Sequence, residues 1–297
     1  MTPADDLAPI GTEDYYIARL HAPAERLRVA LHLALEARLL GLLTDASDPA
    51  TLRLKLCWWQ DCLAAACAEE FRHPLLARLG ALDSGRPAHW RRAFADAALA
   101  LEERLAWQRL LAAEQILEHL RRVEGTLAHA LARDLAPQAA ADDCVDIAEL
   151  AALTAWARGL QWLPHWQRLQ IGWLPREALE AHVADRGIGV AGATASTVEH
   201  DPEHWPRLAE AFIGPVLERA LAAHRRLPRS LRAVTLAVRI RHACGRAELA
   251  RAAAAGWPVL RERATLTPIV RLLLALGVRH FDHLPRGPAA RQRNRAP

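Results

Sequence analysis

Three aspartates in the stretch Asp142-Asp143-Cys144-Val145-Asp146 have the spacing of a magnesium-binding motif. Mg²⁺ prefers hard oxygen ligands, and carboxylates three or four residues apart share one face of a helix. The same residues also suit a helix start, because acidic side chains in the first turn interact favourably with the helix dipole. The sequence offers no partner motif to face them. We therefore favour a helix start and keep Asp142, Asp143 and Asp146 as alternative magnesium ligands.

A second group of metal-ligand residue types runs from Glu199 through His200, Asp201 and Glu203 to His204. These side chains could bind zinc. Pro202 interrupts their spacing, however, and no third strong ligand is evident. We expect Asp201 to cap a helix that starts here.

The apolar residues repeat with a helical period along nearly the whole chain, and Ala, Leu and Arg dominate the composition, which favours helix over strand. With 297 residues, 52% of them hydrophobic, the chain can bury a large core. No repeat or long linker divides it, so we predict one all-α, single-domain bundle over 1–285 and a basic tail over 286–297. The expected helices are 24–43, 50–70, 89–135, 142–163 and 201–224, and the third of these should break near 112–114 or Gly125. After residue 224 we expect further helices, separated at Pro228, Gly245 and 256–258. The stretch 187–197 is predicted to be a Gly/Ala-rich loop.

The charge pattern limits the partners. Lys55 is the only lysine, the formal net charge is +4, and much of that charge lies in the tail. Without the tail there is no broad basic face, so we expect no nucleic-acid partner. The tail is a candidate for weak peripheral contact with an anionic membrane, at about 1 kcal/mol per charge near the surface. The arginines of the tail are Arg286, Arg291, Arg293 and Arg295.

Neither a leader peptide nor a run of about 18 apolar residues is evident. The five cysteines contain no metal-binding pair of the Cys-x-x-Cys type, which suits a reducing compartment. We expect a cytoplasmic protein, with a peripheral location at the inner face of a membrane as an extension.

The stretch 53–63 places Trp58-Trp59 two residues before Asp61 on an expected helix. Squalene/phytoene synthase-like proteins, which are head-to-head prenyl transferases, carry a similar Arg-x-x-Trp-Trp-Arg-Asp-x-Leu. The chain resembles that family from Tyr15-Tyr16 to Leu75 at matching spacings. The resemblance implies an isoprenoid-synthase helical bundle around a central cavity. We expect the two tryptophan rings to pack in the core, with one of them at the cavity wall.

Family members also place an Asp-x-x-x-Asp helix before a Gly-Arg-x-Tyr-Leu-Pro turn. Trp173-Leu174-Pro175 resembles the end of that turn, which puts the two aspartate positions on Trp162 and Trp166. The family's first acidic motif, Asp-Asp-x-x-Asp, would fall on the residues from Leu40 to Thr44. None of these five residues is acidic. Both magnesium motifs therefore lack their carboxylates.

The family reaction begins by ionising an allylic diphosphate, which carries about three negative charges that an apolar cavity cannot hold alone. Magnesium neutralises them and needs carboxylate ligands, whereas tryptophan offers none. We therefore expect no cofactor and no catalysis, as in the family's non-catalytic branch, which includes a mitochondrial complex I assembly factor. The expected partner is an apolar isoprenoid-like ligand or a protein. The apolar cavity is expected to be lined by Trp58 or Trp59, Trp156, Trp162 and Trp166.

Two alternatives remain open. One is a divergent, active prenyltransferase that condenses farnesyl or geranylgeranyl diphosphate with Mg²⁺ held by the aspartates from Asp142 to Asp146, helped by Asp45 or Asp61. The other is a helical domain whose cavity is filled and whose interactions are confined to its surface.

Overall fold

The computed structural model describes residues 6–45, 48–83, 88–105, 111–137, 141–169, 171–184, 205–257 and 263–281. Within these ranges the regular structure is helical and contains no β-strand, which confirms the predicted all-α bundle. The elements are α1 (Glu13–Leu20), α2 (Arg26–Asp45), α3 (Pro49–Cys67), α4 (Pro74–Gly80), α5 (His89–Arg104), α6 (Ala113–Leu120), the π-helical turn η1 (Arg121–Gly125), α7 (Thr126–Leu135), α8 (Ala141–Gly159), the 3₁₀ turn η2 (Leu160–Trp162), α9 (Leu163–Arg168), α10 (Arg176–Ala184), α12 (Trp205–Arg226), the 3₁₀ turn η4 (Arg229–Leu231), α13 (Leu236–Ala254) and α14 (Pro268–Phe281).

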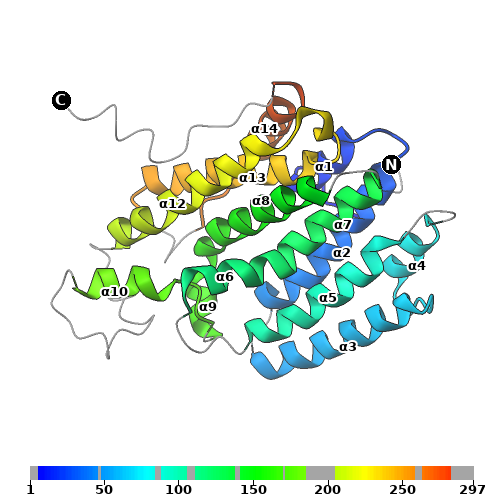
Figure 1. Ribbon diagram of the computed structural model, residues 1–297, viewed down its shortest axis with the longest axis horizontal. Helices are drawn as coiled ribbons and strands as arrows, with labels where there is room; N and C mark the ends of the chain where they lie inside the picture. The colour runs from blue at the N-terminus through cyan, green and yellow to red at the C-terminus, as the bar shows by residue number, and fades with distance from the viewer. Residues whose placement is uncertain are drawn as a thin grey trace.

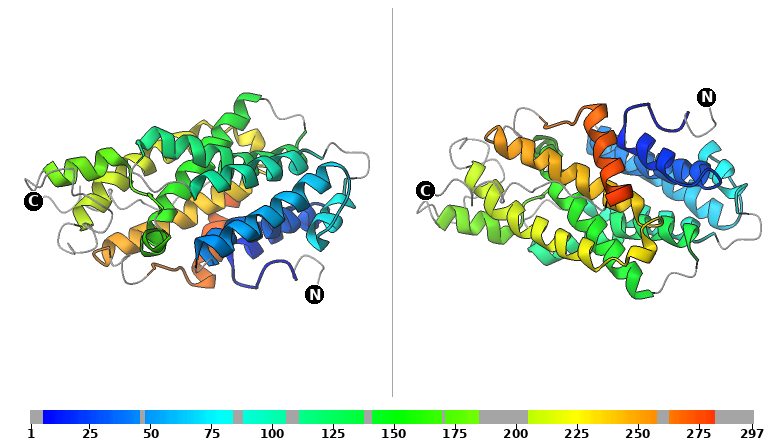
Figure 2. Two further views of the ribbon diagram at one scale, coloured as in Figure 1. Left: turned by 90° about the horizontal axis from the view of Figure 1, so that it is seen from below. Right: turned by 90° about the horizontal axis from the view of Figure 1, so that it is seen from above.

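Helix α8 lies at the centre of the bundle. It packs against α12 and α13 on one side and against α6, η1 and α7 on the other (Figure 1). Helices α3 and α5 form one edge of the molecule, and α14 crosses the opposite edge, where it packs against α13 and α1 (Figure 2).

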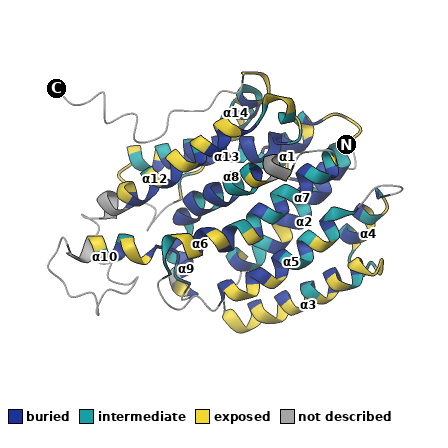
Figure 3. Ribbon diagram, viewed as in Figure 1, coloured by how far each residue is buried: buried dark blue, intermediate teal, exposed yellow. Residues whose placement is uncertain are grey.

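The buried apolar residues form two clusters. The larger one runs through the middle of the bundle from Leu31 on α2 to Trp257 after α13. The smaller one lies between α1, α2, α13 and α14 around Ile17, Ile240 and Val278. Each fully buried Leu, Ile or Phe side chain contributes about 1.5–3 kcal/mol relative to an exposed one, so these clusters are the main stabilising feature. The outer edge of α3 is exposed by contrast (Figure 3).

The helix starts follow local sequence. Asp48 precedes α3, and its carboxylate accepts hydrogen bonds from the backbone N–H groups of Ala50 at 2.8 Å and Thr51 at 3.2 Å. Pro49 occupies the first turn, where no intrahelical N–H partner is lost. Thr12 caps α1 in the same way, by accepting from the N–H of Tyr15.

The expected helix over 89–135 is divided where the sequence indicated, because α5 ends at Arg104 and α6 begins at Ala113. At Gly125, in contrast, the chain stays helical and passes from η1 into α7. A Cβ at Gly125 would lie 3.0 Å from the Cβ of Ala148, so the glycine allows α8 to approach closely.

Two further expectations about helix ends were wrong. Gly245 does not separate helices but lies inside α13. Its lack of a side chain serves packing, because a Cβ there would be 2.9 Å from the side-chain Cδ of Arg158. Asp142 and Asp143 do not precede α8 as caps, because the helix begins at Ala141.

Several expectations fall on residues outside the described ranges. These are the loop over 187–197, the group from Glu199 to His204 and the basic tail over 286–297. Among the helices of the described ranges, none is long and apolar enough to span a bilayer.

Candidate functional site

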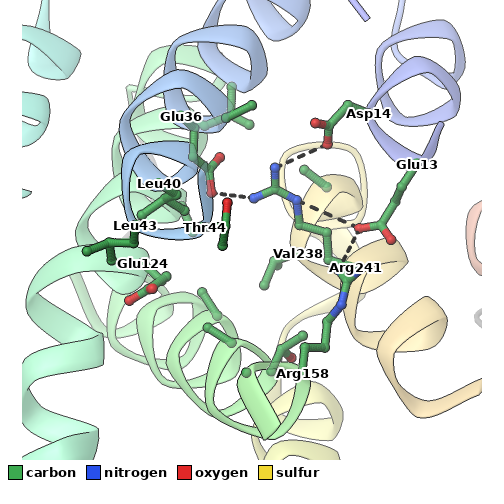
Figure 4. A pocket seen from close by; sticks show the side chains of 18 of the residues that line it. Glu13, Asp14, Glu36, Leu40, Leu43, Thr44, Glu124, Arg158, Val238 and Arg241 are labelled. Carbon is green, nitrogen blue, oxygen red and sulfur yellow. Dashed lines mark hydrogen bonds and ion pairs between the residues drawn. The ribbon is translucent and has the colours of Figure 1, made fainter. Parts of the chain in front are cut away.

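A cavity of about 450 Å³ opens between α1, α2, α8 and α13 (Figure 4). Its volume lies within the range of roughly 300–1,000 Å³ that is usual for ligand pockets. Small side chains on the surrounding helices leave this space open. Ala151, Ala155 and Gly159 follow one another at four-residue spacing along α8 and all line the cavity.

The positions assigned to the two lost acidic motifs meet in this cavity. Leu40 and Thr44 line it from α2, one helical turn apart. Trp162 and Trp166 line it from η2 and α9. Residues that are more than a hundred positions apart in the sequence thus line the same cavity. None of the four carries a carboxylate.

Trp166 and Trp173 form a stacked pair at the cavity. Their ring centroids lie 5.1 Å apart with an interplanar angle of 17°, and the indole N–H of Trp166 donates to the carbonyl of Gly159 at 2.8 Å. A Cβ on Gly159 would lie only 2.0 Å from Trp173, so only glycine fits beneath the ring. The sequence did not single out Trp173 as a cavity residue.

Arg263 and His165 hold the segment from Trp162 to Trp166 in place. The guanidinium of Arg263 lies 3.8 Å from the ring centroid of Trp162, a cation–π contact. His165 Nε2 lies 2.6 Å from the carbonyl oxygen of Leu43. A carbonyl oxygen can only accept, so Nε2 carries the proton, and the bond ties α9 to α2.

Charged residues line the other side of the cavity. Arg241 on α13 donates to the carboxylates of Glu36 and Asp14, the latter at 3.2 Å, and lies 3.9 Å from Glu13 (Figure 4). Burial raises the pKa of Glu36, and Arg241 opposes that shift. Burial alone would lower the pKa of Arg241, but the surrounding carboxylates outweigh it and raise the pKa overall.

Arg158 continues this network from α8. It contacts Glu13 at 3.1 Å and Glu248 at 3.2 Å. Its stem crosses α13 at Gly245, which explains the glycine in the middle of that helix. Burial raises the pKa of Glu248, and Arg158 partly offsets the shift.

The π-helical turn η1 supplies a further acid to the cavity. Arg104 donates to both carboxylate oxygens of Glu124 at 3.1 Å, and its Nε donates to His119 Nε2 at 3.1 Å. Burial and the neighbouring Arg104 lower the pKa of His119 to about 2. π-Helical turns are often found at functional sites, and this one turns Glu124 toward the cavity.

The described residues of the cavity wall therefore carry balanced charge. The expected apolar cavity is apolar only in part, because four arginines and four acids share its lining with aliphatic and aromatic residues. Glu13, Asp14 and Glu36 gather around the guanidinium of Arg241, and Glu124 is bound by Arg104, so each of these acids already has a cationic partner. Within the described ranges, no group of three or more His, Cys, Asp or Glu residues could hold a metal ion. The charged residues are Arg104, Arg158, Arg241, Arg271, Glu13, Asp14, Glu36 and Glu124.

Three of the tryptophans expected at the cavity do not line it. Trp59 is buried against His73, with ring centroids 4.8 Å apart, and Trp58 is half exposed. Both lie on α3 at the edge of the bundle, which keeps them away from the centre. Trp156 packs behind Trp173 and against Phe212.

The aspartates from Asp142 to Asp146 lie in the first turns of α8, as favoured for a helix start. Asp146 forms an ion pair with Arg226 at 2.6 Å and does not line the cavity. The side chains of Asp142 and Asp143 lie outside the described part of the structure. Asp45 and Asp61, the other acids considered for magnesium, are both exposed.

No model of a known protein family matches this chain, and no curated protein matches it either. The likeness to squalene and phytoene synthases therefore rests on the spacing of its residues.

Proposed function

We propose that this protein is a non-catalytic relative of the squalene and phytoene synthases that binds an uncharged, isoprenoid-like ligand in its central cavity. The observation that carries this proposal is the position of Leu40, Thr44, Trp162 and Trp166 at one cavity. Where the family would hold magnesium, these side chains offer aliphatic and aromatic surface. Such a wall favours an apolar chain over metal-bound phosphate.

The charged side of the cavity supports an uncharged head group. A diphosphate brings about three negative charges, which need cations that are not already neutralised. Here Arg241 is bound by Glu36 and Asp14, and Arg104 is bound by Glu124. A diphosphate would have to displace these carboxylates, whereas a hydroxyl or carbonyl group could share hydrogen bonds with them.

The direct test is a titration of the full chain with geraniol, farnesol and geranylgeraniol, followed by tryptophan fluorescence. Farnesyl diphosphate with and without Mg²⁺ is titrated in parallel. We expect saturable quenching by at least one alcohol, the same affinity with or without Mg²⁺, and no gain in affinity from the diphosphate. A titration that is flat for every alcohol would refute the proposal and favour a filled cavity.

A diphosphate-release assay with the same protein distinguishes this function from that of an active prenyltransferase. The release of diphosphate from farnesyl or geranylgeranyl diphosphate is measured with Mg²⁺ present. We expect none above a sample without protein. Magnesium-dependent release that Asp143→Ala abolishes would establish the enzyme instead.

A further inference from the structure

Helix α14 has apolar side chains on two opposite faces. Ala275 and Val278 are buried on its inner face, which packs against α13 and α1. Ile269 and Leu273 are one turn apart on the outer face, and they are 66% and 62% exposed. Exposed apolar side chains that follow one face of a helix mark a surface that a protein or a membrane covers. We define the α14 stripe as Ile269, Leu272, Leu273 and Leu276, of which the second and fourth are half-buried.

The end of the stripe is basic. Between Arg263 and Phe281 the chain contains three arginines and no acidic residue, but Arg263 stacks on Trp162 and Arg271 faces the cavity, which leaves Arg279 beside the stripe. Arg279 near the end of the helix is exposed, and so is Phe281. In the sequence that follows, four arginines stand against the single acid Asp282. An apolar helix face with basic residues beside it is the pattern of helices that lie on anionic membranes.

The length of α14 decides how it would meet a bilayer. Its 14 residues span about 21 Å at 1.5 Å per residue, short of the roughly 30 Å hydrocarbon core. The inner face is also committed to the protein, where Arg271 lines the central cavity and donates to the carbonyl of Gly11. We propose that the α14 stripe docks this protein on an anionic lipid bilayer, with the helix lying in the interface.

A second exposed side chain lies close to the start of the stripe. Gly11 packs against Pro268 at the first residue of α14, and the preceding Ile10 is 77% exposed. The proposed docking surface is extended to Ile10 on this basis. This proposal does not depend on the ligand of the cavity.

The test is co-sedimentation of the full chain with vesicles of phosphatidylcholine, with and without added phosphatidylglycerol. We expect binding to the anionic vesicles that weakens as salt is raised. The double variant Ile269→Ser/Leu273→Ser should reduce the fraction bound at least tenfold. Leu54→Ser is the matched control, because Leu54 is 74% exposed on α3 at the other edge of the bundle. Thermal unfolding followed by circular dichroism checks that both variants are folded.

A chain ending at Phe281 tests the role of the basic sequence. We expect it to bind anionic vesicles several-fold more weakly than the full chain while retaining the dependence on Leu273. The proposal is overturned if the full chain does not sediment with anionic vesicles, or if the double variant binds as well as the wild type. It is likewise overturned if the stripe proves to be a homodimer interface, that is, if the wild type is dimeric, the double variant is monomeric and neither binds vesicles.

Discussion

Glu36 on α2 and Arg241 on α13 form an ion pair at the side of the central cavity, although 205 residues separate them in the sequence. Asp14 from α1 shares the same guanidinium. One arginine thus connects three helices that meet at the cavity, and its loss would leave several partly buried carboxylates without their cation.

We therefore predict that Arg241→Ala lowers the free energy of unfolding by about 3–5 kcal/mol, the usual effect of removing one partner of a buried pair. Arg92→Ala is the control, because Arg92 forms an exposed pair with Asp96 on α5 and should cost less than about 1 kcal/mol. Urea unfolding of both variants measures the difference. Equal effects would mean that the pair at the cavity contributes no more than a surface pair.

Trp166 and Trp58 allow the stability contributions of a buried and a half-exposed tryptophan to be compared. Trp166 is buried, stacked on Trp173 and hydrogen-bonded through its indole N–H, so Trp166→Ala should cost about 3–5 kcal/mol. Trp58 is half exposed, and Trp58→Ala should cost less than about 1 kcal/mol. Urea unfolding of the two variants tests this ranking, and the opposite order would contradict the assignment of Trp166 to the core.

Replacing Gly159 and Gly41 by alanine should change the stability of the protein in opposite directions. Gly159→Ala places a Cβ within 2.0 Å of the Trp173 ring, and overpacking of this kind costs about 1–3 kcal/mol. At Gly41 on α2 the nearest atom is the Asp45 carboxylate at 3.5 Å, so Gly41→Ala should raise stability by about 0.5–1 kcal/mol. Thermal unfolding of both variants is sufficient, and a neutral Gly159→Ala would show that Trp173 can move aside.

His119 should make stability fall in acid. Its pKa is about 2 in the folded protein, lowered by burial and Arg104, against about 6.5 in an unfolded chain. Below pH 6.5 the unfolded chain therefore binds a proton that the folded protein does not. The contribution of His119 is complete above that pH and is lost toward pH 2, at up to about 1.4 kcal/mol per pH unit.

We predict that His119→Gln makes the free energy of unfolding less steep with pH between about pH 6 and pH 4. Urea unfolding at several pH values measures the slope. His280→Gln, at an exposed position on α14, is the control and should keep the wild-type slope. An unchanged slope for His119→Gln would mean that His119 is protonated in the folded protein.

A cavity-filling substitution tests where the ligand binds. Ala155→Leu adds three carbon atoms to the wall, and we expect it to lower the affinity for the best-bound isoprenoid alcohol about tenfold, or about 1.4 kcal/mol. The matched control is Ala64→Leu at an exposed position of α3, which should bind as the wild type does. Fluorescence titration compares them, and equal affinities would place the ligand outside the cavity.

Much of the helical pattern could be predicted from local signals. The Asp48-Pro49 start of α3 depends on a cap and a proline that act within one turn, so sequence alone located it. The assignment of Leu40 and Thr44 to one site with Trp162 and Trp166 depended on the family resemblance alone, because no local signal links positions so far apart. The error at Gly245 has a tertiary cause, since that glycine accommodates an arginine from another helix.

The charged side of the cavity was not predicted. Glu13, Asp14, Arg158 and Arg241 come from three helices, and no spacing along the chain links them. Their pairing depends on how the helices pack.

The turn η1 has a consequence for the charge of this cavity. A π-helical turn contains one more residue than the α-helical turn it replaces, so the side chains after it are offset by about 100° from those before it. A chain lacking that extra residue would run through here as a regular α-helix, and Glu124 would rotate relative to α6, away from Arg104. The extra residue of η1 and the neutral charge of this side of the cavity therefore depend on each other, because removing that residue would separate Glu124 from Arg104.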